Sequence, residues 1–189
     1  DLRQLTNDNE NLQTEIQDIQ LKLKQVNEGQ YQAMLALQSE IDKGLMAAGM
    51  VTVEGPGIEV ILNNPSPGGA DNDYSAELFL IRDEDILKLV NELRASGAEA
   101  ISLNGQRVIA TSEIRFAGSF INVNTTRVVP PYQILAIGDP DELERNLMLS
   151  GGLKDYLSNF GIQVKVETNE KLTVPAFSGD LNYKYVGQS

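Results

Sequence analysis

The residues best suited to bind a ligand lie in one polar segment, residues 104–129. This segment contains three arginines and one glutamate, a local charge of +2 in a chain of net charge −12. Guanidinium groups bind carboxylates and phosphates through paired N–H donors, and Ser, Thr and Asn side chains add neutral donors. The segment therefore predicts a pocket for a small anionic ligand or a patch for an acidic partner. The candidate binding residues are Asn104, Gln106, Arg107, Thr111, Ser112, Arg115 and Asn122.

Arg107 and Arg115 are central to this hypothesis. Asn104-Gly105 predicts a hairpin, because a type I′ turn needs positive φ at both central positions. The returning chain should hold Arg107 near the hairpin mouth and bring Arg115 back to the same side. Two converging guanidinium groups repel unless an acid or anion lies between them, and Glu113 is not the expected acid. The competing interpretation is structural: the polar side chains bond loop backbone, and the arginines pair with carboxylates.

Two other kinds of motif could bind ions, but each has a simpler interpretation. The glycine-containing segments at 55–57 and 151–152 match neither the P-loop nor the dinucleotide fingerprint, so turn geometry explains them better. The carboxylate pairs Asp83/Asp85 and Asp139/Asp141 resemble acid–base or cation sites. Both pairs open predicted helices, however, where acids are favoured by the helix dipole.

The composition narrows the possible chemistry. The chain contains no Cys and no His, so it has no thiolate nucleophile, no imidazole base, no serine triad and no Cys- or His-ligated zinc. Carboxylate chemistry, lysine nucleophiles and hard-cation sites stay open. We expect no catalytic residue, no metal site and no cofactor. The acidic balance also argues against nucleic acid as a partner, because phosphate binding relies on clustered Lys and Arg.

The first 48 residues predict a stalk that precedes the binding domain. Residues 1–28 form a heptad array in which hydrophobic residues alternate at spacings of three and four. An Asn at an a position favours a parallel dimer. Gly29 should weaken the helix, and residues 30–48 should form a second, connecting helix. The predicted dimer contacts are Leu5, Asn9, Leu12, Ile16, Ile19, Leu23 and Val26.

Residues 49–189 predict one α+β domain. A helix is expected at 83–96, with Asp83 as N-cap, and a helical region at 139–160, interrupted at Gly151-Gly152. If residues 104–129 form a hairpin insertion, the remaining order is β-α-β-β-α-β, the ferredoxin-like plait. The four core strands are expected at 57–62, 99–103, 132–137 and 162–167.

Several motifs together resemble the bacterial domain-of-unknown-function family 881, the YlxW/YlxX-like proteins. The most specific is Asn104-Gly105-Gln106-Arg107, followed by Thr111-Ser112 and Arg115. The resemblance covers about residues 40–180 and includes the motifs at 55–60, 81–86, 98–107, 111–115, 130–132, 137–140 and 174–176. It implies single-pass membrane proteins of Gram-positive bacteria, with an N-terminal anchor, a coiled coil and an extracytoplasmic domain. The position of some family genes near cell-division genes implies an envelope or division role.

The chain itself shows no apolar run of the ~20 residues that span a bilayer. It begins at Asp1, inside a heptad, so we expect a chain trimmed from a longer protein whose anchor precedes it. The leading functional hypothesis is a non-enzymatic, membrane-tethered envelope protein. A parallel coiled coil would dimerise it, and its domain would bind an envelope or division protein.

The alternative is a sensor of a small anionic ligand, and an enzyme ranks third. A concave pocket lined by Arg107 and Arg115 would favour the sensor. A flat apolar patch near Pro130-Pro131-Tyr132 would favour partner binding.

Overall fold

The computed structural model describes residues 2–64, 80–118, 120–179 and 185, and leaves out the side chains of residues 2–11. The chain divides into two compact units, Asp1–Leu45 and Met46–Ser189. Sequence patterns had suggested a boundary near residue 48. Among the described residues, no helix combines the length and apolarity that crossing a bilayer requires.

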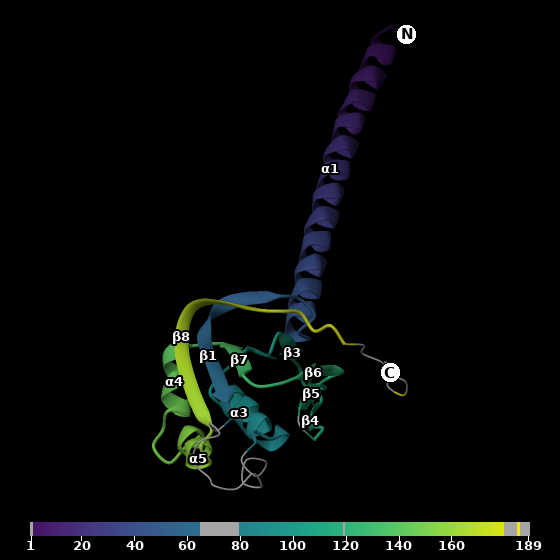
Figure 1. Ribbon diagram of the computed structural model, residues 1–189. Helices are drawn as coiled ribbons and strands as arrows, with labels where there is room; N and C mark the ends of the chain where they lie inside the picture. Colours follow the sequence, from purple (N-terminus) through teal and green to yellow (C-terminus); the bar gives the residue numbers. More distant parts are fainter. Residues whose placement is uncertain (1, 65–79, 119, 180–184, 186–189) are drawn as a thin grey trace, which may run out of the picture. The chain divides into compact units, whose positions relative to one another are not determined.

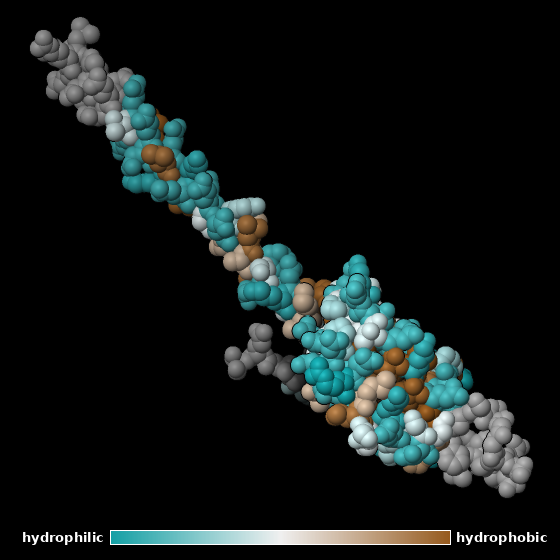
Figure 2. Space-filling view, turned by 90° about the vertical axis from the view of Figure 1, so that its left-hand side faces the viewer, coloured by the Kyte–Doolittle hydropathy of each residue, from teal (hydrophilic) through white to brown (hydrophobic). Residues whose placement is uncertain are grey.

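Helix α1, Leu2–Ala47, is continuous through the expected weak point at Gly29, so residues 30–48 are not a second helix. A glycine in an exposed helix costs only about 1 kcal/mol relative to alanine, and good helix formers surround this one. Ion pairs on the surface of the helix stabilise it further. One of them joins Lys22 Nζ to Asp18 Oδ2 at 2.6 Å. The helix ends before Gly49, whose φ is +76°. Figure 2 shows hydrophobic residues recurring along α1 between hydrophilic ones.

The second unit contains a five-stranded sheet of order β3-β2-β7-β1-β8, in which all neighbours are antiparallel (Figure 1). The predicted order of strands and helices is confirmed, as is the α+β class. A second sheet has the order β4-β5-β6. The elements are β1 Val53–Asn63, α3 Asp83–Ala95, β2 Ala100–Leu103, β3 Gln106–Val108, β4 Ile114–Phe116, β5 Ile121–Val123, β6 Thr126–Val128, β7 Tyr132–Ile137, α4 Pro140–Leu147, α5 Leu153–Asn159 and β8 Gln163–Val174.

Residues 104–129 are not an excursion from the core, which corrects the predicted hairpin insertion. β3 pairs with β2 and becomes the fifth strand of the main sheet. The small sheet contributes buried apolar residues to the same core as α3 and β1, because its strands alternate apolar and polar residues. These residues are Ile114, Ile121, Val123 and Val128.

At the starts of α3 and α4, acidic side chains accept free backbone N–H groups. Asp139 caps α4 as predicted, accepting from the N–H groups of Asp141 and Glu142. Arg82, not Asp83, is the N-cap of α3, and its N–H donates to the Asp85 carboxylate at 3.0 Å. The Asp83 carboxylate instead accepts the N–H of Phe116 at 3.0 Å. This bond ties α3 to β4. Of the two predicted carboxylate pairs, Asp83, Asp85 and Asp139 therefore bond backbone N–H groups.

A bulge in β1 explains the segment Gly55-Pro56-Gly57. The register with β8 shifts between Gly55 and Gly57. A Cβ atom at Gly57 would lie 1.9 Å from the carbonyl oxygen of Ala136, so only glycine fits beside β7. The strand continues through the segment, as β1 and β8 run side by side in Figure 1.

Candidate functional site

Arg107 is the most buried charged residue of the candidate set. The residue is 5% exposed. Nη1 donates to the carbonyl oxygens of Val51, at 3.2 Å, and Pro175, at 3.1 Å. Burial lowers the pKa of Arg107, because desolvation disfavours its charged form. The two carbonyl dipoles compensate part of this cost, since hydrogen bonds to charged groups are stronger than neutral ones.

These bonds join chain segments from the two ends of the domain. The N–H of Phe177 donates to the carbonyl of Gly49 at 2.8 Å, and the N–H of Ala176 donates to Thr52 Oγ1 at 3.3 Å. The segment after β8 therefore lies against the segment before β1. Arg107, on β3, is bonded to both segments through one nitrogen.

Ser112 and Gln106 have structural contacts near Arg107. Ser112 Oγ accepts the N–H of Ile109 at 2.9 Å and donates to the carbonyl of Arg107 at 3.4 Å. Gln106 Oε1 accepts from the Thr126 hydroxyl at 3.3 Å, which connects β3 to β6. Both residues thus shape the segment that follows the hairpin.

Asn104 holds the opposite end of the same hairpin. Asn104 and Gly105 have φ of +46° and +77°, which confirms the predicted turn conformation. The Asn104 carboxamide accepts the N–H of Gln133 at 2.8 Å and donates to the carbonyls of Pro131, at 3.2 Å, and Val129, at 3.4 Å. This side chain therefore fixes the chain around the cis peptide bond between Pro130 and Pro131.

Arg115 does not share a site with Arg107, so that expectation is wrong. The Arg115 side chain is 71% exposed and belongs to the small sheet, with Nε 3.5 Å from Glu113 Oε2. Glu113, which sequence reasoning had set aside, is thus its acidic neighbour. The physical reason is that β4 starts a new sheet with β5, so the chain does not return to Arg107.

The small sheet instead carries a row of exposed cations that sequence reasoning described only in part. Arg115 pairs with Asn122, and Asn122 pairs with Arg127, in adjacent strands. Directly paired residues lie on the same face of a sheet. The Arg127 guanidinium also lies 4.0 Å from the centre of the Phe120 ring. We call Arg115, Asn122 and Arg127 the arginine row.

A cavity of about 490 Å³ lies beside Arg107. Residues 98–101 and 107–111 form much of its wall, together with residues 47–49 and Arg94. Thr111 lines this cavity, but Arg115 and Asn122 do not. Arg94 was not a candidate from the sequence, because its place in the last turn of α3 explained its charge. It donates from Nη2 to the carbonyl of Ile109 at 3.3 Å.

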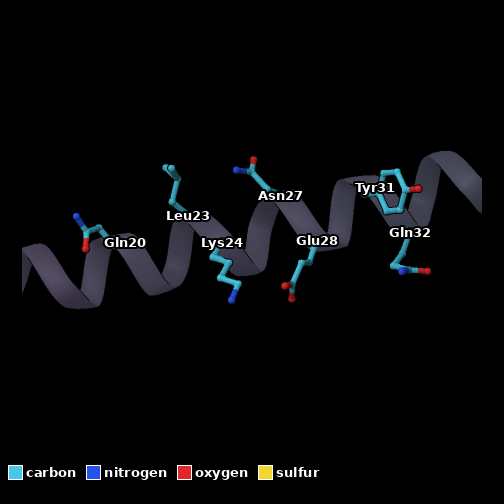
Figure 3. Close-up of a pocket in the computed structure, with 7 residues that line it drawn as sticks. All are labelled: Gln20, Leu23, Lys24, Asn27, Glu28, Tyr31 and Gln32. Atoms are coloured by element: carbon cyan, nitrogen blue, oxygen red, sulfur yellow. The ribbon is translucent and has the colours of Figure 1, made fainter.

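A hollow on α1 and the segment around Tyr132 contribute less to the candidate site. A hollow of about 410 Å³ on α1 is lined by side chains of that helix alone, and Figure 3 shows Leu23 and Asn27 pointing to one side and Lys24 and Glu28 to the other. Tyr132 is buried, 2% exposed, so the expected patch near Pro130-Pro131-Tyr132 does not present this ring. Within the described residues, no group of three or more acidic side chains could hold a metal ion.

Replacing Arg107 should destabilise the domain, whereas the same change at Arg115 should not. Arg107→Met leaves two partly buried carbonyls without their donor, at an expected cost of about 2 kcal/mol. Arg115→Met removes one exposed ion pair and should stay within about 0.5 kcal/mol. Urea unfolding of the two variants measures the difference. Equal stability would show that Arg107 does not tie the two ends of the domain together.

Asn104→Gly isolates the side-chain bonds of Asn104 from its backbone conformation. Glycine keeps the positive φ but removes three hydrogen bonds, so we expect a loss of about 2 kcal/mol in unfolding free energy. Asn124→Gly is the matched control, because Asn124 has a φ of +55° and its side chain makes no hydrogen bond within the described residues. The control should change stability by less than about 0.5 kcal/mol. Similar losses at both positions would contradict the proposed role of the carboxamide.

The comparisons with known proteins agree with this architecture. Residues 40–187 match the family described as "Bacterial protein of unknown function (DUF881)". UPF0749 protein YlxW of Bacillus subtilis is 36% identical over 135 residues, which cover 70% of this chain and 57% of that protein. UPF0749 protein Rv1825 of Mycobacterium tuberculosis is 30% identical over 158 residues, which cover 81% of this chain and 50% of that protein.

A solved structure is also similar. The crystal structure of an uncharacterized conserved protein from Mycobacterium tuberculosis superposes with a TM-score of 0.63 at 28% identity, over 79% of this chain and 99% of that one. The chain spans about half the length of the curated relatives it matches. From the match over residues 40–187, we conclude that this chain belongs to the DUF881 family of bacterial proteins of unknown function.

Proposed function

We propose that this protein is a non-enzymatic, membrane-tethered component of the bacterial envelope, which α1 dimerises and whose domain binds a partner protein. The observation that carries the proposal is the apolar stripe of α1. Its residues are 53% to 63% exposed in the single chain, which is too much apolar surface to leave along a lone helix. The stripe consists of Leu12, Ile16, Ile19, Leu23 and Val26.

A second copy of the chain is the occupant that best fits this stripe. The heptad places Glu15 and Lys22 at g positions, and Gln13, Gln20 and Asn27 at e positions. In a parallel dimer, g residues meet e residues of the next heptad on the partner helix. Every such contact here joins a charge to a neutral amide, so no like charges meet. The predicted contacts Leu5 and Asn9 continue the register, but their side chains lie outside the described residues.

The arginine row supports the second half of the proposal. Arg115 and Arg127 are exposed cations on one face of a sheet, within a chain of net charge −12. Such a row complements an acidic segment of a partner and steers its approach. The envelope or division protein that supplies this segment, the membrane tether and the extracytoplasmic location are proposals that rest on the family resemblance.

A finer description of the fold favours a second candidate function. We assign the domain to the ferredoxin-like plait, because β8, β1, β7 and β2 form an antiparallel sheet and helices follow β1 and β7. β3 extends this sheet by one strand. Domains of this fold often bind small ligands, although fold alone assigns no function. The cavity at Arg107 is the specific observation that favours a sensor of a small anion.

Ile19→Lys tests dimerisation. Ile19 occupies a d position, so a buried charge in each helix should convert the dimer to monomer. Gln17→Lys is the matched control, since it adds the same charge at the outward b position and should leave the mass unchanged. Light scattering coupled to size-exclusion chromatography of the chain measures both. A monomeric wild-type chain, or equal effects of the two variants, would refute the coiled-coil dimer.

The arginine row can be tested in cells with the full-length protein. A photo-crosslinking residue at the exposed Thr125 should give an adduct with the partner. Combined Arg115→Glu and Arg127→Glu should abolish this adduct by placing acids against an acidic partner. Combined Arg145→Glu and Lys165→Glu changes the net charge equally on other elements and should preserve it. An adduct that survives the first pair, or is lost with both pairs, would argue against the row as the docking site.

A further inference from the structure

Arg107 has unused hydrogen-bond donors although it is buried. A guanidinium group carries five N–H donors. Nη1 donates to Val51 and Pro175, whereas Nε and Nη2 make no hydrogen bond within the described part of the chain. Nε–H and one Nη2–H point in parallel along one edge of the guanidinium plane, which is the geometry that a carboxylate accepts through both oxygens. The edge left unbonded is therefore suited to a bidentate ligand.

The cavity beside this edge is kept open by small residues. Its volume of about 490 Å³ lies in the range of small-molecule sites. Ala48, Gly49, Ala98 and Ala110 line it beside the larger Ile101, Val108 and Ile109, so much of the wall is apolar. A Cβ atom at Gly49 would lie 2.6 Å from Ile109 Cγ2 and 3.4 Å from Arg107 Nε. Any larger residue at this position would therefore crowd Ile109 and the unbonded edge of Arg107.

The charge around the cavity selects a singly charged anion. Arg94 and Arg107 line the cavity together with one acid, Glu99, which leaves one net positive charge. Arg94 belongs to the last turn of α3, where the helix dipole is negative. Glu99 and this dipole disfavour a dianion such as phosphate. Burial of Arg107 disfavours its charged form and lowers its pKa. One anion beside the guanidinium would offset this cost.

We propose that the cavity beside Arg107 binds a small monocarboxylate with a short apolar body. Arg107 holds the carboxylate through Nε and Nη2, Arg94 adds a second positive charge at the rim, and the alanine wall contacts the apolar body. Arg107 then has two roles, since Nη1 keeps the two ends of the domain together while the opposite edge binds the ligand. The site lies within the Met46–Ser189 unit and does not depend on dimerisation.

An NMR titration of the whole chain with sodium butanoate tests the site. The Arg107 Nε–H resonance and the Ala110 amide should shift together and saturate at millimolar butanoate, while sodium chloride at equal ionic strength should leave them unchanged. Sodium phosphate should bind more weakly than butanoate. No saturable shift of the Arg107 resonance would overturn the site, and tighter binding of phosphate would overturn the ligand class.

Variants at Ala110 separate charge from bulk without touching Arg107. Ala110→Glu places an acid beside the cavity and should weaken butanoate binding about tenfold. Ala110→Gln has the same shape without the charge and should stay within about twofold. Arg94→Gln should weaken binding by an intermediate factor. Thermal melts check that all three variants are folded, and equal weakening by Ala110→Glu and Ala110→Gln would contradict the electrostatic basis of the site.

Discussion

A single buried guanidinium group joins the two ends of the domain. Arg107 reaches the carbonyls of Val51 and Pro175, which are 56 and 68 residues away along the chain. Val51 lies just before β1 begins, and Pro175 lies just after β8 ends. A lysine would supply one strongly hydrated ammonium and no planar fork, so it could not serve both carbonyls and a ligand equally well.

The rest of residues 104–129 is organised around that hairpin. Asn104 binds the segment before β7, Ser112 closes the turn after β3, and Gln106 contacts β6. These polar side chains therefore build the scaffold that sets the position of Arg107. Their abundance, which suggested a ligand site, is partly the requirement that loop backbone groups find hydrogen-bond partners. Binding by Asn104, Gln106, Ser112 and the other candidates stays a prediction.

The two units of the chain differ in how far their apolar residues are buried. In its described part, the Met46–Ser189 unit buries apolar residues in a large cluster and a smaller one. In the described part of α1, by contrast, an apolar stripe remains half-exposed. Helices gain most of their stability from packing an amphipathic face. A dimer would supply that packing, and the domain would then be displayed in two copies, which raises its avidity for a partner.

Sequence alone determined the local features of this protein. The heptad register, the positive φ of Asn104 and Gly105, the Asp139 cap and the order of strands and helices all follow from neighbouring residues, so they could be predicted. Only the tertiary structure decided which arginine is buried. Arg107 and Arg115 have similar local sequence signals, but their environments depend on strand pairing and on carbonyls far along the chain. Burial is a property of such long-range contacts, and no local pattern contains it.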